Sequence, residues 1–173
     1  GLVKNGLVLA RDHPTLAEVL AGAGYRTAAV VSSFVLDRRF GLDRGFATYD
    51  DRFSGQHASL SRQKWQGVEV DTPFDRRADE TRGRALEWLG ANGYLQRERP
   101  AGQPPFFLWV HFFDPHYPYE PPEELADRYT SAAYKGPIDT TMRTVTAIQQ
   151  GKLLPTGDDL KRLIGLYQAE VTY

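Results

Sequence analysis

The first clear pattern of hydrophobic and polar positions predicts a helix followed by a short strand. Four apolar residues recur at helical spacing and form one stripe: Leu16, Val19, Leu20 and Ala23. Thr15 can cap this helix, Glu18 completes a capping box, and Gly24 is well placed to end it. Residues 26–33, RTAAVVSS, then predict a buried strand. A helix joined closely to a strand predicts an αβ unit in a parallel sheet.

The same order of helix and strand returns later in the chain. Residues 34–74 lack periodicity, which predicts loops with a short helical turn. Residues 77–89 return to helical spacing through alanine and leucine. The run FFLWVHFF, residues 106–113, is apolar without alternation and indicates a central parallel strand buried on both faces. We therefore predict an α/β fold with a mostly parallel sheet flanked by helices.

The remaining residues predict two more helices. Residues 123–129 predict a short helix, and residues 130–155 a long, weakly patterned connection. Thr156 can cap a final helix. Its apolar residues recur at intervals of three and four: Leu160, Leu163, Ile164, Tyr167 and Val171. This stripe still continues at Tyr173, so we expect the chain to be cut within an element.

Composition limits the function classes. The 173 residues suffice for one domain with a core, and the net charge of −1, spread along the chain, argues against nucleic-acid binding. No apolar stretch approaches the roughly 20 residues that span a bilayer, and the first residues lack a signal-peptide pattern. Because the chain has no cysteine, thiolate metal sites and cysteine nucleophiles are excluded from it.

Candidate chemistry lies at the carboxyl end of the second strand. Asp114, His116 and Tyr119 follow that strand, where ligands collect in open parallel sheets. Prolines within residues 115–122 fix the backbone, so the loop can hold an imidazole against a developing anion without reorganising. A hydrogen-bonded surface residue is the alternative for His116, and Asp114 either orients it or accepts backbone N–H bonds. For His111, within the strand, core packing is the better interpretation.

The run PFFLWVHFFDPHYPYEPP, residues 105–122, resembles the Asp-Pro-His-x-Pro-Tyr segment of sulfatases, in the alkaline phosphatase superfamily. Three other segments are similar to sulfatase segments in the same order: residues 15–51, 77–89 and 166–173. The resemblance implies a partial alkaline-phosphatase-like domain, with residues 1–173 an internal fragment of one catalytic domain. It implies that His116 is catalytic and contacts the ester. We predict that Asp114 and Tyr119 also bind substrate.

Most of the machinery of that family is absent from the sequence. Sulfatases use a modified Cys or Ser in a Cys/Ser-x-Pro-Ser-Arg motif, and Asp-Asp and Asp-Asn or Asp-His pairs that bind a divalent metal. Ser61-Arg62 lacks the surrounding motif, and Asp50-Asp51 lies on the wrong side of the first strand, so it is interpreted as a solvated acidic pair. The resemblance implies Ca²⁺ or a similar ion in the parent, and we expect no metal in this piece.

One departure from the family bears on the ester itself. Many sulfatases follow Gly-Tyr-x-Thr with Gly-Lys-Trp-His, whose Lys and His bind sulfate. The matching positions here are Ser32 and Phe34. Loss of charged donors from an oxyanion site costs several kcal/mol of transition-state binding. We therefore expect the parent to supply this charge from elsewhere, or to act on phosphate esters.

Three functions remain open from the sequence. The first is a sulfatase-like hydrolase acting on sulfate esters of a small molecule or glycan, of which this chain is an inactive part. The second is a phosphohydrolase or phosphotransferase with the same fold, and the third is a non-catalytic binding domain. The family is compatible with a periplasmic or secreted parent.

Overall fold

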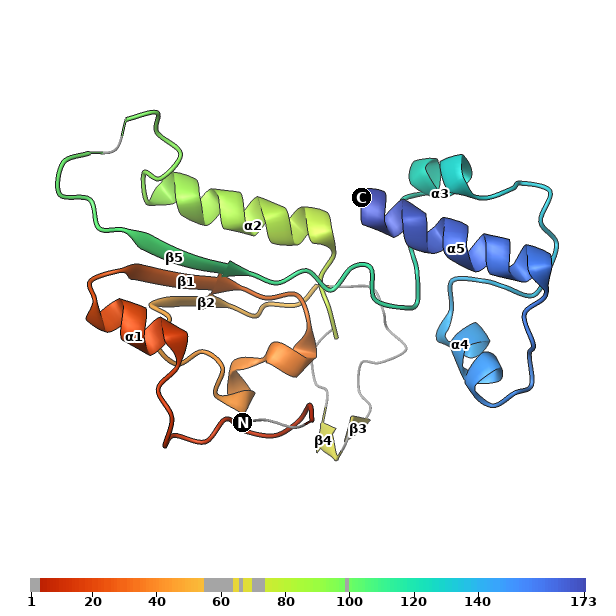
Figure 1. Cartoon of the computed structure of the whole chain (residues 1–173), viewed down its shortest axis with the longest axis horizontal. Coiled ribbons are helices and arrows are strands. Elements are labelled where there is room, and N and C mark those ends of the chain that lie inside the picture. Colours follow the sequence, from red (N-terminus) through yellow and green to blue (C-terminus); the bar gives the residue numbers. More distant parts are fainter. Residues whose placement is uncertain (1–3, 55–63, 66, 70–73, 99) are drawn as a thin grey trace. The chain divides into compact units, whose positions relative to one another are not determined.

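The structure is a computed structural model, and it describes residues 4–54, 64–65, 67–69, 74–98 and 100–173. Ser61-Arg62 lies outside these residues. The chain divides into two units, Gly1–Phe113 and Asp114–Tyr173 (Figure 1). The first unit is built on a sheet covered by helices, and the second consists of helices and their connecting loops.

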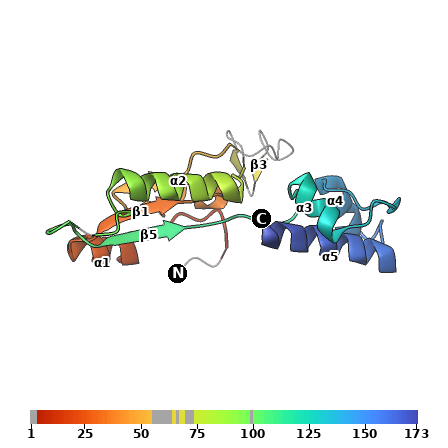
Figure 2. The same cartoon turned by 90° about the horizontal axis from the view of Figure 1, so that it is seen from above.

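The described strands of the first unit include a three-stranded parallel sheet with the order β2-β1-β5. The central strand β1 (Arg26–Val30) pairs with β2 (Thr48–Asp50) on one side and with β5 (Phe106–Val110) on the other. Helices α1 (Leu16–Gly22) and α2 (Ala78–Ala91) cover opposite faces of this sheet (Figures 1 and 2). The predicted α/β class, with a parallel sheet flanked by helices, is confirmed.

The start of α1 follows the predicted capping box. The Thr15 hydroxyl accepts from the Glu18 backbone N–H at 3.1 Å, and the Glu18 carboxylate accepts from the Thr15 N–H at 2.7 Å. The predicted stripe, however, is not the buried face of the helix. Leu16 and Val19 are exposed, whereas Ala17 is buried. Ala17 lies where the backbone of Gly45 approaches the helix: a Cβ atom at Gly45 would lie 2.5 Å from the Ala17 carbonyl carbon.

The interpretation of residues 34–74 as loops with a short helical turn is partly wrong. The region also contains strands. Its described elements are η1 (Phe34–Leu36), η2 (Arg38–Phe40), β2, and the antiparallel pair β3 (Lys64–Trp65) and β4 (Val68–Glu69). The two 3₁₀ turns, η1 and η2, agree with the expected helical turn. Strand β2 covers only three residues, which is too short for a periodic pattern to show.

The prediction of a central strand over residues 106–113 is wrong in position and length. β5 covers the first five of these residues and lies at an edge of the described parallel sheet, with β1 at its centre. Its apolar run is explained by aromatic partners. The Phe106 ring lies 4.6 Å from the Tyr94 ring, and the Phe107 ring stacks on Phe46 at 5.7 Å between centroids.

A buried arginine joins strands β1 and β2. The Arg76 side chain is fully buried, and its Nη1 lies 3.0 Å from Asp50 Oδ1. Its Nη2 donates to the Val31 carbonyl at 2.7 Å. Asp50 also pairs with Arg52 at 2.6 Å, and the Asp51 side chain, 7% exposed, pairs with Arg38 at 2.6 Å. The interpretation of Asp50-Asp51 as a solvated pair is therefore wrong, since both carboxylates are enclosed and held by arginines.

This network predicts an acid-sensitive fold. Burial alone would raise the pKa of Asp50, but hydrogen bonds from Arg52 and Arg76 outweigh it and hold that pKa at about 2. The carboxylate therefore stabilises the fold fully above its unfolded pKa of about 3.9, and this contribution is lost as the pH falls from about 4 to 2. Urea unfolding at a series of pH values should show the loss. The Asp50→Asn variant should be less stable than the unmodified chain at pH 6, and its free energy of unfolding should fall less on acidification. An acid dependence equal to that of the unmodified chain would contradict the assignment to Asp50.

The second unit contains helices α3 (Glu123–Tyr129), α4 (Met142–Gln149) and α5 (Gly157–Thr172). α3 has the predicted bounds and packs along α5. α4 lies in the stretch interpreted as a weakly patterned connection, so that interpretation is wrong there. Thr156 begins α5 as predicted, and its N–H donates to Asp159 Oδ2 at 2.8 Å.

The apolar stripe of α5 is not its buried face. Four of its five residues are exposed: Leu160, Ile164, Tyr167 and Val171. The buried positions are mostly small or acidic: Asp159, Gly165, Leu166, Ala169 and Glu170. A Cβ atom at Gly165 would lie 2.3 Å from the Tyr129 carbonyl oxygen at the end of α3. The absence of a side chain at this position is what lets α3 approach so closely.

Candidate functional site

The loop of residues 114–122 carries the predicted site residues and leads into α3. Asp114 opens the second unit and is half buried, whereas His116 is exposed. The His116 Nδ1 atom lies 2.7 Å from the carbonyl oxygen of Tyr117. Because a carbonyl oxygen only accepts, Nδ1 is the nitrogen that donates in this contact. At Nδ1, therefore, a backbone carbonyl orients the imidazole.

The tyrosines of this loop pack against α5. The Tyr119 ring lies 4.8 Å from the Tyr117 ring and 5.6 Å from the Tyr167 ring of α5. Burial raises the pKa of Tyr119, and it raises the pKa of Tyr117 to about 12. Both phenols are thus neutral at physiological pH and can donate hydrogen bonds.

A buried carboxylate fixes the end of the loop. Glu170 of α5 is 6% exposed, and its Oε1 accepts from the Glu120 backbone N–H at 2.6 Å. This contact is not predicted from the sequence. The available signal was an acidic residue next to Ala169, on the small-residue face of the helix, where a solvated carboxylate would not be expected.

His111 and Ser32 lie in the first unit, at the carboxyl end of β1 and β5. The Ser32 hydroxyl donates to the His111 carbonyl at 2.5 Å and lies 3.4 Å from His111 Nδ1. Ser32 is fully buried, and burial lowers the pKa of His111, so its ring is neutral at physiological pH. This geometry agrees with the interpretation of His111 as a packed residue with a partner at one ring nitrogen.

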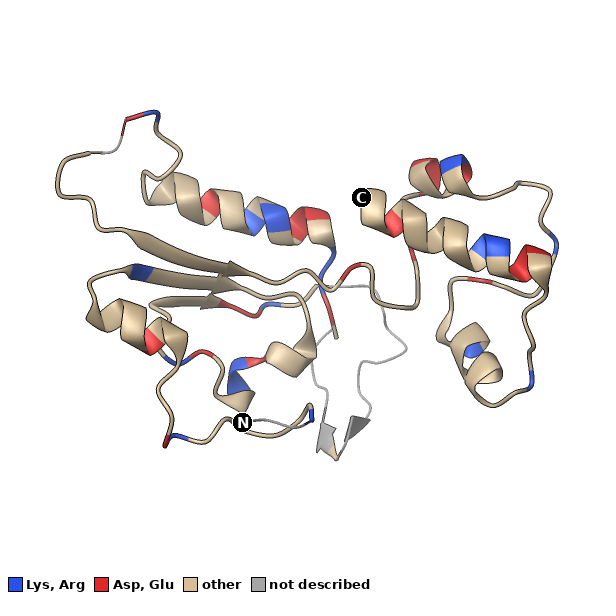
Figure 3. Cartoon of the chain, viewed as in Figure 1, with Lys and Arg blue, Asp and Glu red and all other residues tan. Residues whose placement is uncertain are grey.

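Other features of the described residues bear on cofactors and partners. No helix in the described part of the chain is long and apolar enough to cross a membrane. Within the same residues, no group of three or more His, Asp or Glu side chains could hold a metal ion. Basic and acidic residues are interspersed along the described elements of each unit (Figure 3).

A family model described as Sulfatase matches residues 4–173. The chain belongs to the sulfatase family. A search among curated proteins finds no match. Sulfatases are hydrolases and are generally metal-dependent, but the described residues of this sulfatase chain do not fit a metal site.

The two positions where this sulfatase chain departs from the family's Lys and His belong to its core. Phe34 is fully buried, with its ring 5.8 Å from Phe40 and 5.7 Å from Phe74. Ser32 is equally buried and uses its hydroxyl on the His111 carbonyl. Neither residue can replace the positive charge that a Lys and a His would bring to an ester.

Proposed function

We propose that this chain supplies His116 to the ester-binding site of a sulfatase-like hydrolase acting on sulfate esters of small molecules or glycans. The observation that carries the proposal is an exposed imidazole fixed at Nδ1 by the Tyr117 carbonyl. In this proposal the contact at Nδ1 fixes the orientation of the ring, and Nε2 is the nitrogen that meets the ester. Family membership supports this role, because His116 stands in the Asp-Pro-His-x-Pro-Tyr run that resembles the sulfatase segment.

The chemistry of His116 follows from its tautomer. In the neutral ring, Nε2 accepts a proton; once protonated, it donates a hydrogen bond to an oxygen of the ester. Such a donor is most effective when it is already in place as negative charge develops. The proline-rich backbone and the Glu120–Glu170 hydrogen bond keep the loop in position, which limits the reorganisation needed during the reaction.

Asp114 and Tyr119 have supporting roles in this proposal. Tyr119 is held between two aromatic rings and positions the loop through packing. Asp114, two residues before His116, is the second residue of the loop that we propose to bind substrate. We also propose that the 173 residues are part of one catalytic domain, whose nucleophile and metal ligands are supplied by other segments of the parent.

A phosphate ester is the second candidate substrate. It stays a candidate because Ser32 and Phe34, both buried, stand where many sulfatases have the cationic pair that binds sulfate. Parallel turnover of 4-nitrophenyl sulfate and 4-nitrophenyl phosphate by the parent enzyme would separate the two. Preference for the phosphate would replace sulfate in the proposal while leaving the role of His116 unchanged.

Replacing His116 with alanine in the parent enzyme should lower kcat/KM by about tenfold or more, equivalent to about 1.4 kcal/mol. The reason is the loss of a hydrogen bond that strengthens as charge develops on the ester. His13→Ala is a suitable control, since the side chain of His13 is exposed in the other unit. The isolated 173-residue chain is the blank and should show no turnover. An unchanged kcat/KM for His116→Ala would reduce His116 to a scaffold residue.

A further inference from the structure

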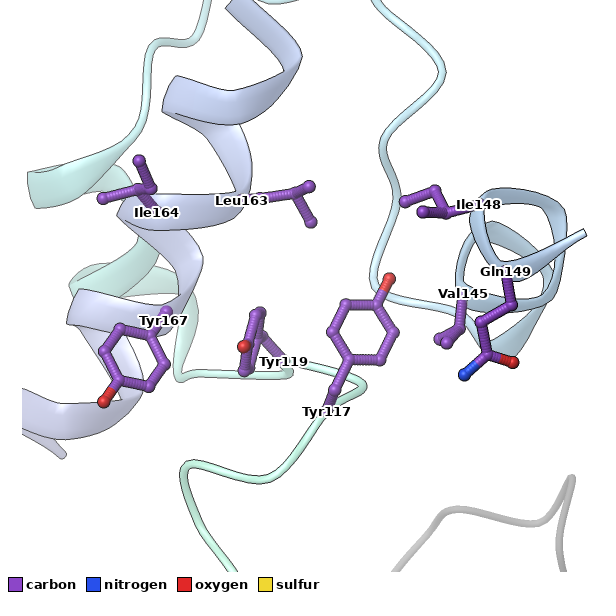
Figure 4. Close-up of a pocket in the computed structure, with 8 residues that line it drawn as sticks. All are labelled: Tyr117, Tyr119, Val145, Ile148, Gln149, Leu163, Ile164 and Tyr167. Atoms are coloured by element: carbon purple, nitrogen blue, oxygen red, sulfur yellow. The ribbon is translucent and has the colours of Figure 1, made fainter. Parts of the chain in front are cut away.

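The second unit contains a pocket with a volume of about 440 Å³ between the His116 loop and helices α4 and α5 (Figure 4). Eight residues line it: Tyr117, Tyr119, Val145, Ile148, Gln149, Leu163, Ile164 and Tyr167. Its volume lies within the range of about 300–1,000 Å³ that is typical of small-molecule sites. Most of its lining is aliphatic or aromatic, so the pocket favours an apolar ligand.

The Tyr117 hydroxyl gives this pocket a specific polar contact. The oxygen is buried and, among the described residues, has no hydrogen-bond partner. Figure 4 shows the Tyr117 ring beside the pocket with its hydroxyl directed toward Ile148. Burial raises the pKa of this phenol to about 12, so it is a neutral donor. A buried donor without a partner is unfavourable, and an acceptor on a ligand would remove that cost.

Tyr117 also connects the pocket to the imidazole. Its backbone carbonyl holds His116 Nδ1, while its side chain lines the pocket. The pocket-lining ring and the imidazole therefore belong to adjacent residues of the chain. The proposal is that a molecule whose reacting oxygen is bound at His116 extends from there into this pocket.

We propose that the pocket binds the apolar, ring-containing alcohol part of the ester, with the Tyr117 hydroxyl donating to an oxygen on it. This inference rests on the proposed function of His116. A sugar fits the lining less well. Gln149 and the tyrosine hydroxyls are the polar groups that the lining offers, and a sugar in an apolar pocket leaves hydroxyls unpaired.

Binding of 4-methoxyphenol to the 173-residue chain, followed by NMR titration, tests the proposal without requiring turnover. Tyr117→Phe keeps the ring and removes the donor, so affinity should fall about fivefold. Ile148→Ser should weaken binding further, because it places a hydroxyl in the apolar lining. Leu154→Ser is the matched control: Leu154 is exposed and outside the pocket, and this variant should bind like the unmodified chain.

The outcomes separate this inference from the proposed function. Equal affinity of the unmodified chain, Tyr117→Phe and Ile148→Ser would overturn the pocket assignment even if His116→Ala impairs the parent enzyme. Glucose binding in place of 4-methoxyphenol, with the same sensitivity to the variants, would also overturn it and indicate a glycan ligand. Binding with the expected losses, combined with full turnover by His116→Ala, would confirm a ligand pocket at Tyr117 but refute both the proposed function and the assignment of the ligand as part of the ester.

Discussion

Replacing Arg76 with alanine is expected to lower the free energy of unfolding by at least about 3 kcal/mol. The substitution leaves Asp50 without its fully buried partner and deprives the Val31 carbonyl of its donor. Removing one member of a buried ion pair is costly because the remaining charge stays desolvated. Urea unfolding of the 173-residue chain at neutral pH, followed by circular dichroism, measures this loss.

Arg52→Ala is the matched control for this prediction. Arg52 pairs with the same carboxylate at 2.6 Å, but its side chain is 72% exposed. Solvent screens an exposed pair, so its removal should cost about 1 kcal/mol or less. If Arg76→Ala and Arg52→Ala destabilised the chain equally, the buried ion pair would contribute no more to stability than the exposed one.

Gly165→Ala should destabilise the second unit by about 1–3 kcal/mol. Alanine is the better helix former, so propensity alone predicts the opposite sign. The loss arises because the new Cβ would lie 2.3 Å from the Tyr129 carbonyl oxygen, which belongs to backbone and cannot move aside easily. Thermal unfolding, followed through the tyrosine signals, would measure this loss of stability.

Gly157→Ala, at the start of the same helix, isolates the packing effect. A Cβ atom at Gly157 meets nothing within 4 Å, so this variant should be neutral or slightly more stable. A stabilised Gly165→Ala variant would mean that α3 does not approach α5 as closely as the structure has it.

The helix starts could be predicted from sequence because their determinants are local. Thr15 and Thr156 each cap a helix together with an acidic residue three positions later. These contacts need no other part of the chain. The bounds of α3 could be predicted for the same reason, since prolines precede it and its first turn is acidic.

The buried faces could not be predicted, because they depend on distant partners. Asp50 looked solvated in the sequence because Arg76, its buried partner, lies 26 residues further along. On α5, the large apolar side chains suggested the core, but the close approach of α3 selects Gly165 and Ala169 instead. Size complementarity, rather than hydrophobicity alone, decided which face is covered.

The candidate site was predictable in part. Motif and position single out His116 and its proline-rich loop, and the role of His116 stays a prediction. The roles of Tyr117 and Glu170 were not visible, since one acts through its backbone carbonyl and the other through a contact 50 residues away. The pocket is lined by residues from α4, α5 and the loop, so no pattern within a single segment predicts it.

The double use of Tyr117 has an evolutionary consequence. Its carbonyl, which orients His116, is present whatever amino acid occupies the position, whereas the ring and hydroxyl that line the pocket are specific to tyrosine. Under the proposed assignment, a substitution at this position would change the alcohol that the pocket accepts and keep the backbone contact that orients His116.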